Sequence, residues 1–166
     1  MNIKDDHLYH GAALIQIAEH PQFTAINSIK TVNAVSRSAY RINDDIAVYL
    51  KYASTEPNAS GEFVFTFTTE HLNELQALAQ GAQKLFIALV VVKGREICVL
   101  SYAELQALIG YRTTSKGAPE SSYSILLTLK KGSAFRAYVN AAGTKGKFAG
   151  KQLIIPRNKF PGYLFS

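Results

Sequence analysis

The last third of the chain combines basic and aromatic side chains in a way that suits binding to nucleic acid. The basic side chains that we expect to contact phosphates are Lys130, Lys131, Arg136, Lys145, Lys147 and Lys151. Aromatic residues alternate with them along the sequence, namely Tyr123, Phe135, Tyr138 and Phe148. Lysine and arginine neutralise phosphates, and exposed rings stack on unpaired bases. Rings in strands more often fill a core, so we expect these aromatics to be buried and the lysines to meet the polyanion.

The charge distribution agrees with this interpretation. Residues 1–110 hold eight basic and eleven acidic side chains, whereas residues 111–166 hold ten basic side chains and one acidic side chain, Glu120. This asymmetry predicts an electropositive face that attracts polyanions, among which nucleic acid is the commonest in a cytosol. The alternatives are a basic surface that only keeps the protein in solution, or one that binds an acidic protein.

Other chemistry has less support in the sequence. His7 and His10 have the spacing of two metal ligands on a helix, but structural zinc needs four ligands. Gly150 and Lys151 lack the first glycine and the final Ser or Thr of a phosphate-binding loop. Cys98 lies between Ile97 and Val99, where a buried thiol is normally inert. We therefore expect no metal and no cofactor.

Length and composition indicate one globular domain. The chain has 166 residues, of which 48% are hydrophobic and 18% are charged. The longest apolar run, Leu85 to Val92, is far shorter than the ~20 residues of a membrane helix. The first residues lack the basic start and apolar run of a signal peptide, and Cys98 is the single cysteine. These features predict a cytoplasmic protein without membrane contact.

Hydrophobic periodicity predicts an α/β (α+β) fold, with one mixed, largely antiparallel sheet flanked by two main helices and one short helix. Helices are expected at 8–20, 69–83 and 102–109, and strands at 23–32, 39–42, 46–53, 62–68, 85–92, 96–100, 123–131, 134–140 and 153–155. The first helix should bury the stripe formed by Leu8, Ala12, Ile15 and Ala18, which Leu14 and Ile17 widen. The polar stretch 111–122 is expected to be a loop that separates a core, 7–110, from a basic, β-rich extension, 111–166, packed on it.

The hairpin around Lys51 carries a resemblance to a known fold. Its strands contain Tyr40-Arg41-Ile42 and Val48-Tyr49-Leu50-Lys51, and the expected element order is helix, strand, hairpin, helix, strand. This element order and the residue pattern of the hairpin strands resemble the PD-(D/E)xK nuclease-like fold over roughly residues 7–109. The stretch from Phe63 to Leu105 also resembles uncharacterised bacterial proteins of this kind.

The resemblance implies a set of catalytic positions. In nucleases of that family, two acids hold Mg²⁺, and a lysine on the same sheet face positions the attacking water. Lys51 stands at the lysine position, but Tyr49 stands where the neighbouring acid is expected, and tyrosine offers no anionic oxygen to Mg²⁺ at neutral pH. Asp45 in the hairpin turn and Glu19 late in the first helix are the remaining acidic candidates.

The sequence therefore predicts a non-catalytic module that binds nucleic acid or another polyanion on a degenerate nuclease-like core. One alternative is an active Mg²⁺-dependent nuclease that uses Lys51, Glu19 and Asp45. Another is a protein-interaction subunit that docks through a sheet edge and its aromatic tail, Phe160 to Phe165.

Overall fold

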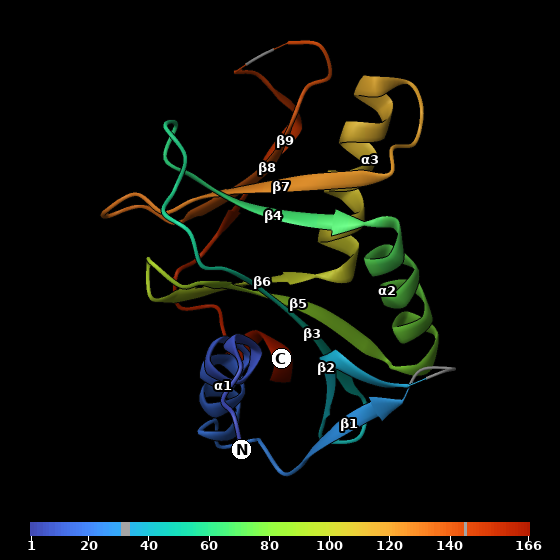
Figure 1. Ribbon diagram of the computed structural model, residues 1–166, viewed down its shortest axis with the longest axis vertical. Helices are drawn as coiled ribbons and strands as arrows, with labels where there is room; N and C mark the ends of the chain where they lie inside the picture. The colour runs from blue at the N-terminus through green and yellow to red at the C-terminus, as the bar shows by residue number, and fades with distance from the viewer. Residues whose placement is uncertain (31–33, 145) are drawn as a thin grey trace.

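The computed structural model describes residues 1–30, 34–144 and 146–166, and within them the chain is a single mixed α/β domain (Figure 1). Three α-helices, nine β-strands and a C-terminal 3-10 turn follow one another along the chain. Their order is α1 (Asp5–Ala18), β1 (Ile26–Lys30), β2 (Val35–Ile42), β3 (Ile46–Ala53), β4 (Glu62–Thr68), α2 (Thr69–Gly81), β5 (Lys84–Val91), β6 (Glu96–Ser101), α3 (Tyr102–Lys116), β7 (Ser122–Thr128), β8 (Phe135–Asn140), β9 (Phe148–Ile155) and η1 (Gly162–Phe165).

The strands form two sheets where the sequence indicated one. Sheet A has the order β1-β2-β3-β5-β6, and sheet B has the order β4-β7-β8-β9. All neighbouring strands are antiparallel except β3 and β5, which are parallel. The cause of the split is visible in β4, which buries Phe63, Phe65 and Phe67 on one face and exposes Val64 and Thr66 on the other. A strand with one apolar face suits an outer layer, so β4 pairs with β7 above sheet A instead of joining it.

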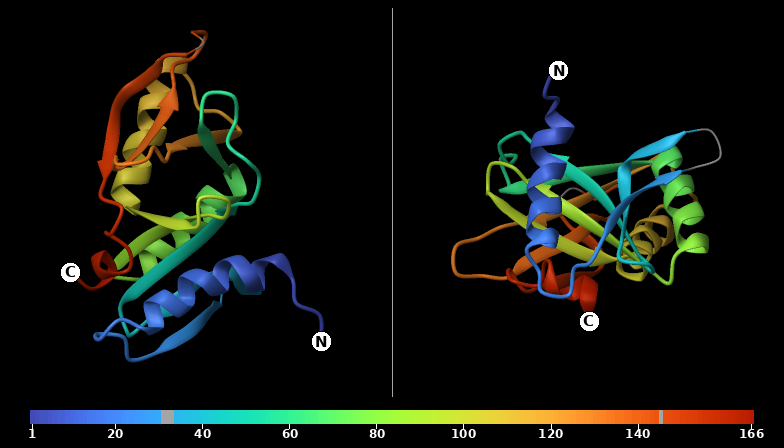
Figure 2. Two further views of the ribbon diagram at one scale, coloured as in Figure 1. Left: turned by 90° about the vertical axis from the view of Figure 1, so that its left-hand side faces the viewer. Right: turned by 90° about the horizontal axis from the view of Figure 1, so that it is seen from below.

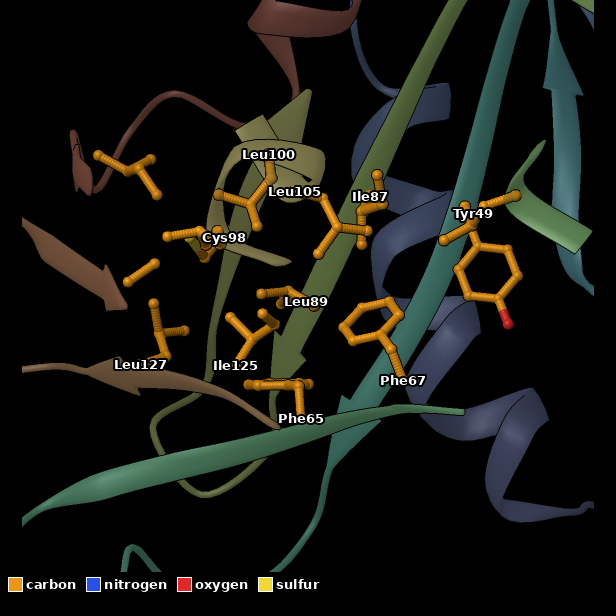
Figure 3. Packing of buried hydrophobic residues seen from close by; sticks show 14 of the residues in the cluster. Tyr49, Phe65, Phe67, Ile87, Leu89, Cys98, Leu100, Leu105, Ile125 and Leu127 are labelled. Carbon is orange, nitrogen blue, oxygen red and sulfur yellow. The ribbon is translucent and has the colours of Figure 1, made fainter. Parts of the chain in front are cut away.

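The main core lies between the two sheets, and α2 and α3 pack against it (Figure 1). Figure 3 shows its centre, where Phe65 and Phe67 of β4 face Ile87 and Leu89 of β5. The other labelled side chains come from β3, β6, α3 and β7, and they are Tyr49, Cys98, Leu100, Leu105, Ile125 and Leu127. Sheet B thus shares its core with sheet A, and residues 111–166 form part of one folded unit.

The opposite face of sheet A is covered by α1 and the C-terminal tail (Figure 2). Val48 of β3 and Phe86 of β5 meet Ile17 of α1 and the tail residues Phe160 and Leu164, all of them buried. Strand β5 is consequently covered on both faces, which confirms the expectation of a central strand at 85–92. The tail uses its apolar side chains within the chain itself. The hypothesis of a protein-interaction subunit therefore depends on docking through the sheet edges.

The buried face of α1 includes Ile17 and part of Leu14 from the predicted stripe, but it is not centred on that stripe. The helix buries His10, Ala13 and Ile17, whereas Leu8 and Ile15 are 55% and 62% exposed. The sequence offers apolar residues on two sides of this helix, and periodicity alone does not choose between them. The side that the structure buries is the one on which the His10 ring packs edge-on against Tyr52 of β3, with the ring centroids 5.6 Å apart. No helix in the described ranges has the length and apolar character needed to cross a membrane.

Helix α3 is longer than predicted and runs through the expected loop at 111–122. It continues to Lys116 and ends at Gly117, whose φ of 80° forms a left-handed cap. The hydroxyl of Thr113 donates a hydrogen bond to the carbonyl of Ile109 (3.0 Å), so a polar residue is satisfied inside the helix. Because α3 crosses residue 110 and β4 pairs with β7, the expected boundary between core and extension does not coincide with a break in the structure.

Candidate functional site

The predicted phosphate-contacting residues lie on the β8–β9 hairpin and on the turn before it. Lys130 and Lys131 are exposed in the β7–β8 turn, Arg136 is exposed on β8, and Lys147 and Lys151 are exposed at the start of β9 and on it. Lys145 lies outside the described residues. The six residues of β8 span ~20 Å, so the lysines of its two ends are separated by that length. The basic residues therefore form a strip along the hairpin and not one compact cluster.

The four aromatic residues divide between the two faces of sheet B. Tyr123 and Phe135 are buried between the sheets, as predicted. Tyr138 is half-buried on the outer face, and Phe148 beside it is 47% exposed, with ring centroids 6.0 Å apart. Tyr138 and Phe148 therefore offer apolar ring surface to solvent at the middle of the basic strip.

Two carboxylates and two arginines outside this strip are occupied by structural contacts. Arg112 binds Glu120 through Nε (2.6 Å), and Arg157 binds Glu96 on β6. Arg157 also donates to the carbonyl of Ser133 (2.9 Å), so it holds the turn before β8 against sheet A. These arginines are anchors of the fold. The positive charge available to a ligand in the last third of the chain rests on the exposed residues of the strip and on two lysines outside it. These are exposed Lys116 at the end of α3 and half-buried Lys159 over the Tyr163 ring.

One acidic group lies within the outer face. The hydroxyl of Tyr138 donates to the carboxylate of Glu62 on β4. Burial and this hydrogen bond raise the pKa of Tyr138, so the phenol stays neutral at any physiological pH. The contact fixes the orientation of the Tyr138 ring and engages Glu62, the acid nearest to the rings.

The three residues proposed for metal-dependent catalysis are not brought together. Lys51 lies in the second half of β3, whereas Asp45 precedes the first residue of that strand. Six residues of extended chain separate the two by ~20 Å. Glu19 caps the C-terminal end of α1, while the N-terminal part of that helix, at Asp6, reaches Tyr52 beside Lys51. The structure thus places both proposed acids at the far end of sheet A from the lysine.

Two histidines and a phenol surround Lys51 instead. The pairing of β2 with β3 ends at Tyr49, and a cleft of about 330 Å³ opens beside the unpaired part of β3. Its lining residues are Asp6, His10, Ser38, Tyr49, Leu50, Lys51, Tyr52 and His71. Lys51 Nζ lies 3.2 Å from His71 Nδ1 and 4.8 Å from the centroid of the Phe67 ring. Burial lowers the pKa of Lys51 from 10.5 to about 8.

The hydrogen bonds around His71 define its protonation. Its Nδ1 accepts the backbone N–H of Thr68 (3.1 Å) at the start of α2, so this nitrogen carries a lone pair. Burial, together with the nearby Lys51 charge, lowers the pKa of His71. The ring is therefore neutral, with its proton on Nε2. The sequence shows no second functional residue near His71. The histidine occupies the last position of the Thr68–His71 capping box, where glutamate is usual.

Tyr49 and His10 are the other functional groups of the cleft. Burial raises the pKa of Tyr49 to about 12, and the phenol shares a hydrogen bond with Ser38. His10 is 6% exposed, and burial lowers its pKa. Sequence reasoning treated His10 as an exposed residue near a helix start, and no local pattern pairs it with Lys51. Only the packing of α1 on β3 brings them to one cleft.

The chain was compared with known proteins at the level of family, sequence and fold. No protein-family model matches it, and no curated protein or solved structure matches it significantly. The resemblance to PD-(D/E)xK nucleases therefore stays a hypothesis that rests on element order and on Lys51.

Proposed function

We propose that this protein binds single-stranded nucleic acid, without cleaving it, across the outer face of sheet B. The observation that carries the proposal is the ring pair of half-buried Tyr138 and exposed Phe148, which is flanked on the same hairpin by Arg136 and Lys147. Rings supply a stacking surface that every base can use, and basic side chains along the strip meet the backbone. No recognition helix is needed for such contacts, so binding should tolerate any base sequence.

The length of the strip favours a polymer over a small anion. Lys130 and Lys131 lie at one end of β8 and Lys147 lies near the other, ~20 Å away. A single phosphate cannot reach both ends, whereas several consecutive nucleotides can.

Fluorescence anisotropy with a labelled single-stranded oligonucleotide over a salt series tests the proposal. We expect the logarithm of affinity to fall linearly with the logarithm of salt concentration. The double variant Lys130→Glu with Lys131→Glu should reduce that slope. Its matched control is Lys30→Glu with Arg41→Glu, two exposed residues on β1 and β2 of sheet A. Phe148→Ala should weaken binding by ~10-fold or more, since stacking contributes ~1–3 kcal/mol per base.

The control for Phe148→Ala is Ile154→Ala, because Ile154 is an exposed, non-aromatic residue of the same strand (63% exposed). Equal losses for the two variants, or no binding at low salt, would refute the proposal. Adding Mg²⁺ to the same samples tests the nuclease alternative. Cleavage that Lys51→Ala abolishes would make hydrolysis the function in place of binding.

A further inference from the structure

The cleft beside Lys51 holds a buried hydrogen-bond acceptor that has no partner. His10 is 6% exposed, and no described residue forms a hydrogen bond with its Nδ1. The backbone of Arg37 lies within hydrogen-bonding reach of the ring and favours a ring proton directed at it. Because Nδ1 has no partner within the described ranges, we assign that proton to Nε2. Nδ1 therefore carries a lone pair, and no donor among the described residues faces it. An unsatisfied buried acceptor destabilises a fold unless a ligand or water completes it.

The same cleft holds a cation that has no counterion. Among the described residues Lys51 forms no ion pair with a carboxylate. Its ammonium group has three N–H donors, and the only hydrogen bond described for it goes to Nδ1 of His71, a nitrogen that it shares with the Thr68 backbone. An oxyanion in the cleft would satisfy the remaining donors.

Charge and size restrict the ligand. His10 lies within the electrostatic range of both Asp6 and Lys51, and the Glu74 carboxylate acts on Tyr49 and His71. Lys51 is thus the one lysine or arginine among the described residues that line the cleft, and negative charge borders it on two sides. A dianion such as phosphate would be repelled by Asp6 while Lys51 offsets one of its two charges. A carboxylate carries the single charge that Lys51 can match. The volume of about 330 Å³ suits a small molecule, and a second cavity of about 590 Å³ shares Asp6 and His10 with it.

We propose that the Lys51 cleft binds a small monocarboxylate that also carries a hydroxyl or amino group, with the carboxylate on Lys51 and the donor on Nδ1 of His10. This site uses none of the residues assigned to nucleic acid on sheet B. The neutral Tyr49–Ser38 pair offers a further hydrogen bond to the same carboxylate. Tyr52, whose hydroxyl lies 3.4 Å from Asp6, closes the side toward α1.

Two matched probes test the role of the donor. Glycolate and acetate differ by a single hydroxyl group, and inorganic phosphate provides a dianion. Nuclear magnetic resonance follows the ring protons of His10 and His71 during titration of the full chain with each probe. We expect saturable shifts with glycolate, binding of acetate weaker by ~10-fold because Nδ1 stays unpaired, and no saturable shift with phosphate.

Two variants test the role of the cation. Lys51→Met keeps the apolar stem on the Phe67 ring and should abolish the glycolate shifts, whereas Lys93→Met should leave them unchanged. Equal affinity for acetate and glycolate would overturn the proposal, as would equal binding of phosphate or glycolate shifts that persist in Lys51→Met. Absence of any saturable shift in the unmodified chain would also overturn it. Nucleic-acid binding is measured separately, so neither result decides the other.

Discussion

The ammonium group of Lys51 and the backbone N–H of Thr68 both point at the same nitrogen, Nδ1 of His71, at 3.2 and 3.1 Å. This shared acceptor joins β3 to the start of α2 across the edge of the main core. It also keeps a lysine in a half-buried position where no carboxylate of the described residues compensates its charge. The arrangement makes Lys51 the residue whose titration should be most visible in the stability of the fold.

We expect the free energy of unfolding to depend on pH through Lys51. Its pKa is about 8 in the folded chain and 10.5 when exposed, so the unfolded chain binds more protons between these values. The contribution of Lys51 to stability therefore rises with pH from about 8 to 10.5 and is constant below pH 8. Urea unfolding of the wild type and of Lys51→Met between pH 7 and 10 should show the advantage of the variant shrinking as pH rises.

The comparison with Lys51→Met is necessary because Cys98 acts in the opposite direction. Burial raises the pKa of its thiol, so ionisation of the unfolded chain lowers stability in alkaline solution. This effect is the same in both proteins and cancels in their difference. A difference that stays constant across the pH range would contradict the assignment of Lys51 as a buried titrating group.

Helix α1 offers a matched pair of isoleucines. Ile17 is fully buried against sheet A, and Ile15 is 62% exposed on the opposite side. Ile17→Ala should lower the free energy of unfolding by about 2–5 kcal/mol, because it leaves a cavity under the helix. Ile15→Ala should change it by less than ~0.5 kcal/mol. Chemical denaturation at neutral pH distinguishes them, and the reverse order would mean that α1 docks through its other face.

Gly150 on β9 faces the ring of Tyr111 on α3. A Cβ atom at Gly150 would lie 2.3 Å from Cγ of that ring, and the backbone there has a φ of +66°. Gly150→Ala should therefore cost about 2–5 kcal/mol, from left-handed strain together with overpacking. Gly132 has a φ of +75° and open space at the same point, so Gly132→Ala should cost only the ~1–2 kcal/mol of strain.

Tyr111→Ala provides the internal check on this prediction. In the Tyr111→Ala background the additional cost of Gly150→Ala should fall toward that of Gly132→Ala, because the ring no longer obstructs the new methyl group. Thermal unfolding of the four combinations measures this coupling. Additive effects of the two substitutions would show that the ring does not lie against Gly150.

Much of the local structure is readable in the sequence because the responsible signals are local. Alternating side chains predict β3 at 46–53 and β4 at 62–68, and the structure confirms both. Ser101 and Glu104 form the capping box that marks the start of α3. The continuous apolar run at 85–92 predicts a strand covered on both faces, as β5 is. In each case a single pairing period or a four-residue motif is sufficient.

Other features depend on which surfaces meet, and these are decided by the tertiary structure. The polar residues 113–115 are typical of a loop, yet α3 includes them because it packs along β8 and β9. The alternation in β4 marks a strand with one apolar face, which suits an outer layer, but the sequence contains no signal that selects β7 as its pairing partner. Basic residues of the last third were identified from charge, but the outward placement of Arg136, Tyr138 and Phe148, with Phe135 inward, follows from strand register.

The sequence by itself determined the element types, the basic character of the last third and the presence of a lysine in the hairpin. The tertiary structure decided that Lys51 meets His10 and His71, which are separated from it in the chain by 41 and 20 residues. It also decided that Glu19 and Asp45 lie elsewhere. The physical reason is that helical and strand periods depend on residues that are neighbours in the sequence. The contacts within a cleft depend on how helices pack on sheets, and no short stretch of sequence specifies that packing.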